Sequence, residues 1–188
     1  MPEATLGSSR VPAVFLLLFC TIVSGTLAAA DAVVSAHAVK AAYLHRFASY
    51  VEWPGDAAAT QPFVIAVAGD EEVATHLEKL LPGMTVRGRP AELRRVSRAQ
   101  ELEGVSILYV GPNALRRTRE LRSAAVRLPV MIVTDDKHGF EAGAVINFIE
   151  VDRSVRFEIS LDAADRAGLK IDSALLSVAA RVEPRIVP

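Results

Sequence analysis

Short apolar runs alternate with amphipathic segments along most of the chain. The runs 63–68, 105–110 and 130–133 contain almost only apolar residues, which predicts strands buried on both faces of a sheet. Between them apolar residues recur at helical spacing, and Asp70 stands where it can cap the helix after the first run. One further strand is expected within residues 85–96. Strands that alternate with helices predict a largely parallel sheet covered by helices.

The first amphipathic segment is rich in aromatic residues. Its apolar stripe consists of Val39, Tyr43, Phe47, Tyr50 and Val51. This spacing predicts one helix over residues 36–53, which Pro54 and Gly55 end. Such a stripe usually faces the core of its own protein, but aromatic side chains are also enriched at the hot spots of interfaces. The candidates for a partner or ligand site in this segment are Tyr43, Phe47, Tyr50 and Trp53.

Towards the C-terminus, residues 145–150 and 155–160 predict an antiparallel hairpin with a loop of four residues between its strands. The predicted pairs are Phe148 with Phe157 and Ile146 with Ile159 toward the core, and Asn147 with Glu158 and Ile149 with Arg156 on the other face. Asn147 is the one polar residue in an apolar strand. Further candidates for a partner or ligand site are Asn147, Arg156 and Glu158. The alternative is that the charged pair members are ordinary charges on an exposed strand.

Two short helices close the chain. One covers residues 162–167 and ends at Gly168. The second has a predicted buried stripe that consists of Leu175, Val178, Ala179 and Val182. Together these elements predict an α/β fold, a single domain with a mixed, mostly parallel sheet flanked by helices, a C-terminal antiparallel hairpin and two closing helices.

The N-terminal segment predicts export. Residues 11–30 carry no charge, and small residues precede Asp31, so we expect a secretory signal peptide cleaved near Ala30 and a domain over residues 31–188 that works outside the cytoplasm. An uncleaved membrane anchor is the alternative, because about 20 apolar residues can span a bilayer. Export disfavours enzymes that need ATP or NADH, and it disfavours nucleic acid as a partner.

Cysteine content and charge distribution limit the functions expected of the domain. The one cysteine, Cys20, lies in the segment that we expect to be removed, so disulfides and thiolate chemistry are not expected in the domain. Charge is unevenly distributed, with ten arginines and four glutamates between Arg87 and Arg127. Such an excess can steer an acidic partner or an anionic headgroup surface toward the protein, although a solvated helix face is the more ordinary reason for it.

The sequence lacks the common catalytic motifs, such as a nucleophile elbow, a zinc-binding H-E-x-x-H or a phosphate-binding loop. Three carboxylates, Asp70, Asp135 and Asp136, follow predicted strands at the edge where α/β sheets bind ligands. They suggest an alternative function, an exported Mg²⁺-dependent phosphoester hydrolase. Acidic residues in caps and turns, however, have local hydrogen-bonding roles. We therefore expect no enzyme activity, no cofactor and no metal.

Several motifs of the chain resemble the YfiR family, the DUF4154 domain. They are the segments 40–44 (KAAYL), 51–54 (VEWP), 147–148 (NF), 155–159 (VRFEI) and 163–171 (AADRAGLKI), together with Phe47. The resemblance extends from about residue 36 to residue 182. Two positions depart from the family pattern, since Ser160 and Asp172 stand where Asn and Ser are typical.

The resemblance implies a periplasmic regulator. The best-studied members bind the periplasmic part of an inner-membrane diguanylate cyclase and hold it inactive, which lowers cyclic-di-GMP and biofilm formation. The resemblance further implies a homodimer and sequestration by an outer-membrane lipoprotein. Some members use disulfides as a redox input, which a domain without cysteine cannot do. A more general periplasmic ligand-sensing module, whose partner varies, is the remaining alternative.

Overall fold

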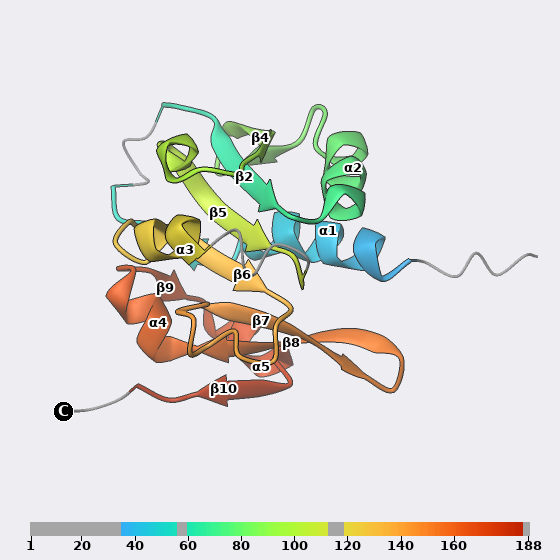
Figure 1. The fold of residues 1–188 in the computed structure, drawn as a ribbon, viewed down its shortest axis with the longest axis vertical. Coiled ribbons are helices and arrows are strands. Elements are labelled where there is room, and N and C mark those ends of the chain that lie inside the picture. Colours follow the sequence, from blue (N-terminus) through green and yellow to red (C-terminus); the bar gives the residue numbers. More distant parts are fainter. Residues whose placement is uncertain (1–34, 56–59, 113–118, 186–188) are drawn as a thin grey trace, which may run out of the picture. The chain divides into compact units, whose positions relative to one another are not determined.

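Eight strands form one mixed sheet. The computed structural model describes residues 35–55, 60–112 and 119–185, so the expected signal peptide lies outside the described residues. Across the sheet the order is β10-β8-β7-β6-β5-β2-β4-β3 (Figure 1). The strands are β2 (Phe63–Ala68), β3 (Thr85–Val86), β4 (Arg89–Arg95), β5 (Val105–Val110), β6 (Met131–Thr134), β7 (Ile146–Val151), β8 (Ser154–Ser160) and β10 (Arg181–Glu183). Neighbouring strands in the series β7-β6-β5-β2-β4 are parallel, and so are β8 and β10. The pairs β7 with β8 and β3 with β4 are antiparallel. The mixed, mostly parallel sheet is therefore confirmed.

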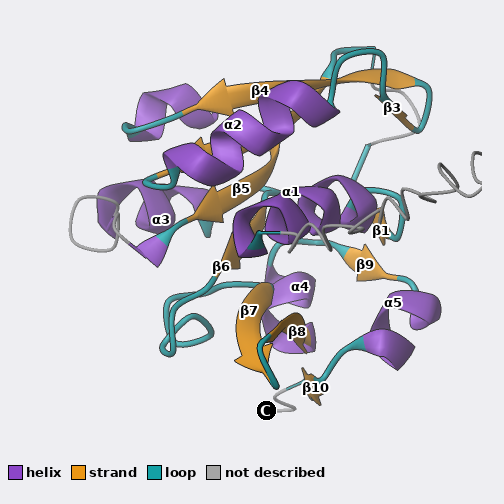
Figure 2. Ribbon diagram, turned by 90° about the vertical axis from the view of Figure 1, so that its right-hand side faces the viewer, coloured by secondary structure: helices purple, strands orange, loops and turns teal. Residues whose placement is uncertain are grey.

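Helices cover both faces of this sheet. The helices are α1 (Ala36–Phe47), α2 (Glu71–Leu80), the 3-10 helix η2 (Ala99–Leu102), α3 (Arg119–Ala125), α4 (Leu161–Arg166) and α5 (Ser173–Val178). Figure 2 shows α1 beside α2. These two helices share a core cluster with one face of the sheet, and α3 and η2 share another with the opposite face. No helix in the described part of the chain is both long and apolar enough to cross a membrane.

The β2 strand shows why an uninterrupted apolar run forms here. All six of its residues are buried. Because side chains alternate along a strand, Phe63, Ile65 and Val67 join the cluster beneath α1 and α2. Their neighbours Val64, Ala66 and Ala68 join the cluster beneath α3. A strand with helices on both sides therefore needs apolar residues at every position.

The helix starts follow local rules. Ser35 Oγ accepts a hydrogen bond from the Ala38 N–H at the start of α1, at 3.1 Å. Asp70 Oδ1 accepts one from the Val73 N–H at the start of α2, at 3.0 Å. Each side chain satisfies a backbone donor that has no partner within its helix. The capping role predicted for Asp70 is thus confirmed.

The first helix is shorter than predicted. It ends at Phe47, and β1 (Val51–Glu52) pairs with β9 (Lys170–Ile171) in a separate two-stranded sheet. The Asp172 N–H also donates to the Tyr50 carbonyl at 2.8 Å, which holds the turn between α1 and β1. Val51 is buried as expected, but from a strand. The prediction of a helix over residues 36–53 was wrong because long-range strand pairing replaced helical hydrogen bonds after Phe47.

The hairpin register was predicted correctly and its loop was not. All four predicted pairs occur, with Phe148 opposite Phe157 and Asn147 opposite Glu158. The strands continue one pair further, to Val151 opposite Ser154, so the loop has two residues instead of four. Those residues, Asp152 and Arg153, have φ angles of 50° and 59°. This left-handed conformation matches the twist of a hairpin.

Two other expectations need correction. Residues 85–96 form two short antiparallel strands, β3 and β4, instead of one. In the last helical segment Leu175 is buried, but Val178 is 55% exposed and Val182 belongs to β10. The chain leaves the helix after Val178 because β10 pairs with β8 and closes that edge of the sheet.

Candidate functional site

A polar cluster lies where three parallel strands end. Asp70 follows β2, Tyr109 lies in β5, and Asp135 follows β6. The Tyr109 hydroxyl lies 3.2 Å from Asp70 Oδ2 and 3.1 Å from Asp135 Oδ2. From α1, Lys40 Nζ donates to Asp135 Oδ2 at 2.5 Å. Parallel strands bring their carboxyl ends to one edge of a sheet, and this topology explains why these side chains meet.

Burial affects the Tyr109 hydroxyl at the centre of this cluster. Tyr109 is fully buried, and burial first, then the charges of Asp135 and Asp70, raise the pKa of its hydroxyl above the ordinary value. The hydroxyl is therefore protonated at neutral pH, and its one proton can serve only one carboxylate at a time. Asp135 Oδ1 is buried and has no hydrogen-bond partner among the described residues.

Protein side chains already bind the carboxylate oxygen at the centre of this cluster. Lys40 and Tyr109 both occupy Oδ2 of Asp135, so a cation at that oxygen would compete with a lysine ammonium. The third carboxylate of the hydrolase alternative, Asp136, accepts a hydrogen bond from the His138 N–H within its own turn. The described residues contain no group of three or more His, Cys, Asp or Glu side chains arranged to hold a metal ion.

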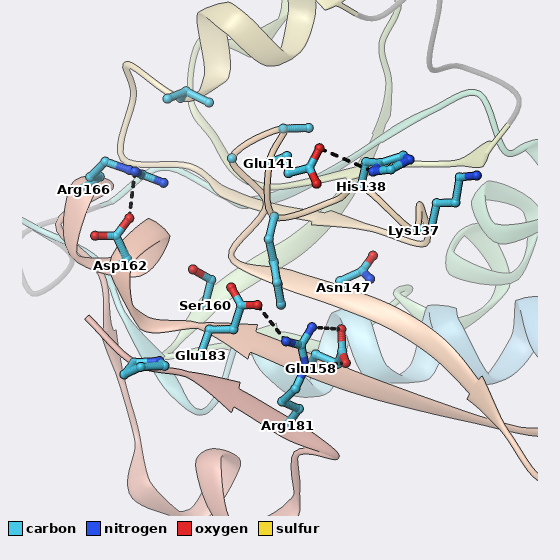
Figure 3. A pocket seen from close by; sticks show the side chains of 15 residues that line it. Lys137, His138, Glu141, Asn147, Glu158, Ser160, Asp162, Arg166, Arg181 and Glu183 are labelled. Carbon is cyan, nitrogen blue, oxygen red and sulfur yellow. Dashed lines mark hydrogen bonds and ion pairs between the residues drawn. The ribbon is translucent and has the colours of Figure 1, made fainter. Parts of the chain in front are cut away.

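A second polar feature is a cavity of about 730 Å³ beside the hairpin. Figure 3 shows it between the loop 137–143 and the strands β7, β8 and β10. Its labelled polar side chains are Lys137, His138, Glu141, Asn147, Glu158, Ser160, Asp162, Arg166, Arg181 and Glu183. On β7 and β8 the residues alternate, so Phe148 and Phe157 face the aromatic core while Asn147 and Glu158 face this cavity.

An arginine on β10 neutralises the hairpin carboxylate. Arg181 stands next to Glu158 in the strand register, and its Nε and Nη2 atoms donate to the two Glu158 oxygens at 2.8 and 3.1 Å. Arg181 Nη1 also reaches Glu183 Oε1 at 2.7 Å. The hydrogen bonds from Arg181 are the main cause that lowers the pKa of Glu158, against the effect of burial, and Asn147 adds a further hydrogen bond. This bidentate pair holds Glu158 ionised.

Asn147 is a cavity-wall side chain whose hydrogen-bonding capacity is only partly used. It is 5% exposed, and its Oδ1 atom has no partner among the described residues. The atom faces Gly139, where an added Cβ would lie 2.8 Å from Asn147 Oδ1 and 2.6 Å from Thr134 Cγ2. Only glycine fits at that place in the loop. Thus the loop approaches the sheet closely enough to bury the amide oxygen without pairing it.

An apolar groove of about 340 Å³ lies on the other side of the hairpin. Its apolar and aromatic lining is Tyr43, Phe47, Tyr50, Phe157, Leu175 and Val178, with Arg46 at the edge. Phe47 is buried and contacts Phe157 edge-to-face, with the ring centroids 4.9 Å apart. Tyr43 and Tyr50 are only partly buried. The predicted aromatic stripe therefore divides into a buried floor and two tyrosines that reach the surface.

The remaining predicted residues lie apart from these two hollows. Trp53 is buried edge-to-face against Phe63, and its indole N–H donates to the Ser106 carbonyl at 3.1 Å. Arg156 is exposed on β8 and lines neither the cavity nor the groove. Trp53 thus has a structural role available, whereas Arg156 has no hydrogen bond or ion pair with a described residue that would assign it a role.

Sequence reasoning missed three residues of these sites. Lys40 lies on the first helix and Tyr109 near the end of an apolar strand, so each could have been noticed as a polar group pointing at the strand ends. Arg181 gave no such signal, because the segment that contains it was read as the end of a helix. Its strand exists only through pairing with β8.

Comparison with known families assigns the domain. The family model DUF4154, described as YfiR/HmsC-like, matches residues 37–180. The chain belongs to this family. YfiR-like domains are periplasmic and regulatory. A search of curated proteins finds no match.

Two solved structures are similar in fold. A conserved domain protein from Vibrio cholerae O1 biovar El Tor aligns with a TM-score of 0.52 at 13% identity, covering 79% of this chain and 60% of that chain. An ABC domain in complex with L-Trp from Streptococcus pneumonia aligns with a TM-score of 0.45 at 13% identity, covering 64% and 55%. This chain thus spans about three fifths or less of either protein, and at this identity the Vibrio structure shows a shared fold only.

Proposed function

We propose that this YfiR-like chain is a periplasmic regulatory protein. It binds a partner diguanylate cyclase in the inner membrane and represses it. The observation that carries the proposal is the family match over residues 37–180. The side chains support a binding role, because Lys40 and Tyr109 engage Asp135, Tyr109 also reaches Asp70, and Asp136 accepts a hydrogen bond within its own turn. The proposal includes export, a homodimer, and sequestration by an outer-membrane lipoprotein.

Repression of this kind requires differential binding. A regulator shifts an enzyme only if it prefers the inactive conformation over the active one. A hundredfold shift needs about 2.7 kcal/mol of preference. A few well-placed aromatic contacts supply free energies of this size at protein interfaces. The proposed mechanism therefore needs a small, specific docking surface and no chemistry.

The apolar groove is the proposed docking surface for the cyclase. Tyr43 and Tyr50 are aromatic and partly exposed above the buried Phe47, and Val178 is 55% exposed at the opposite wall. Arg46 at the edge complements an acidic side chain of the partner. An apolar side chain of the partner would cover Val178 and pack against the exposed parts of Tyr43 and Tyr50.

A deletion tests the regulatory role. Removing the gene is expected to raise cellular cyclic-di-GMP, and crosslinking in whole cells is expected to join the protein to a membrane protein with a diguanylate cyclase domain. Unchanged cyclic-di-GMP together with no such crosslink contradicts the proposal.

A point variant tests the groove. Val178→Asp places a charge on an exposed wall position, so we expect a folded protein that loses the crosslink and raises cyclic-di-GMP as the deletion does. Val151→Asp is the matched control, because Val151 is 42% exposed near the hairpin turn and outside the groove. If both variants repress like the unmodified protein, the cyclase docks elsewhere.

A further inference from the structure

Three arginines surround a hollow of about 360 Å³ next to α3. Arg119 and Arg122 come from the helix and Arg127 from the turn that follows it. The opposite wall is Glu141 and Ala142, from the loop beside the cavity. Glu141 is the one acidic side chain in this lining, and it already lies 3.3 Å from His138 Nδ1. None of the three guanidinium groups forms an ion pair with a residue that the structure describes.

Several other arginines among the described residues form ion pairs. On the cavity side, Arg166 pairs with Asp162 at 2.7 Å and Arg181 pairs with Glu158 at 2.8 Å. Arg122, in contrast, is only partly exposed, and its Nε atom is buried with no partner among the described residues. A buried donor without a partner costs free energy that an anion at the hollow would recover.

Apolar side chains lie next to these arginines. Val126 is 39% exposed and lines the same hollow, and Leu128 is 38% exposed two residues further on. Arg119, Arg122 and Val126 fall on one face of the helical turns, and Leu121 lies in the core. We call this set, Arg119, Arg122, Val126, Arg127 and Leu128, the α3 basic surface.

We propose that the α3 basic surface docks the domain on a membrane through the phosphate groups of anionic phospholipids. Guanidinium groups match phosphate oxygens in a bidentate geometry. Basic residues beside exposed aliphatic ones are the combination that holds a protein at the headgroup region of a bilayer. A free phosphate would use the arginines but gain nothing from Val126 and Leu128.

Vesicle binding by the full chain tests this proposal. We expect binding to phosphatidylcholine vesicles that contain phosphatidylglycerol to exceed binding to phosphatidylcholine alone, and the excess to fall as salt rises. Each basic side chain near an anionic surface contributes roughly fivefold. Arg119→Gln with Arg127→Gln should therefore lower the excess partitioning by roughly thirtyfold. Both side chains are exposed, so the variant is expected to fold.

The matched control removes the same charge elsewhere. Lys79→Gln with Arg153→Gln changes two exposed cations that have no ion-pair partner in the described part of the chain, so vesicle binding should not change. Equal binding to neutral and anionic vesicles, or an equal loss in both double variants, overturns the proposal. So does arginine-dependent binding of inorganic phosphate, or of an acidic envelope protein, without binding to anionic vesicles. None of these results depends on the identity of the cyclase.

Discussion

At the residue scale, Lys40 and Asp135 form the most buried ion pair described here. Their side chains are 14% and 10% exposed, and Nζ lies 2.5 Å from Oδ2. A buried charge without its partner is costly, because its attraction to the missing partner is lost while its desolvation remains. Losing one partner of the pair is therefore expected to lower the stability of the fold by more than the intact pair contributes to it.

We predict that Lys40→Met destabilises the domain by roughly 3–5 kcal/mol, measured by urea denaturation followed by circular dichroism. Lys79→Met, at an exposed position with no ion-pair partner among the described residues, should change the free energy of unfolding by less than about 0.5 kcal/mol. Adding Asp135→Asn to Lys40→Met should restore part of the loss, because it removes the unpaired charge. No recovery in the double variant would contradict this explanation.

Glu158 makes stability depend on pH. In the folded protein Arg181 lowers the pKa of the Glu158 carboxyl below its ordinary value of 4.5. The pair therefore stabilises the fold above pH 4.5, and this stabilisation is lost as the pH falls through the pKa of the folded state. Since Arg181 is half exposed, we expect Glu158→Gln to cost about 1 kcal/mol at neutral pH. The difference from the unmodified protein should shrink below pH 4.5. Glu150→Gln, at an exposed position on β7, should show no such trend.

At the scale of the element, the C-terminal hairpin shows how alternation determines register. A shift of one residue would move Phe148 and Phe157 out of the core and bury Glu158 among aromatic rings. The register could therefore be predicted from the sequence. The turn could not, because Asp152 and Arg153 are not the glycine-containing pair that usually marks a two-residue turn.

We predict that Arg153→Gly stabilises the protein. Arg153 has a φ of 59°, a left-handed conformation that costs a non-glycine residue about 1–2 kcal/mol. Glycine adopts it freely but loses about 0.5–1 kcal/mol of chain entropy, so the net gain should be about 0.5 kcal/mol and raise the Tm by about 1–2 °C. Ser154→Gly, at the adjacent strand position, should lower the Tm. A lower Tm for both variants would refute the prediction.

At the scale of the whole molecule, segments that are far apart in the sequence pair with one another. β1 pairs with β9, so the turn after α1 is held by residues about 120 positions later in the chain. β10 closes the sheet beside β8, and Arg181 also lies over the Phe140 ring at 5.6 Å. The family match ends at residue 180, just before this strand. β10 is therefore a structural part of this domain that lies beyond the family match.

We predict that truncation after residue 180 destabilises the domain by roughly 2–4 kcal/mol, since it removes strand hydrogen bonds and leaves Glu158 without its arginine. It also exposes the edge of β8, which favours association of chains. Urea denaturation and size-exclusion chromatography with light scattering measure the two effects. Arg181→Gln keeps the strand, so it should cost less and leave the oligomeric state unchanged. Equal behaviour of both variants would show that the strand itself is dispensable.

The sequence alone determined what depends on local periodicity. It predicted the buried strands, the Asp70 cap and the hairpin register, because burial on one or both faces requires a characteristic spacing of apolar residues. Only the tertiary structure decided the end of α1 at Phe47, the strand order, and the pairs Lys40–Asp135 and Arg181–Glu158. These features depend on which distant segments meet. Competition between local hydrogen bonds and long-range pairing cannot be judged from one segment at a time.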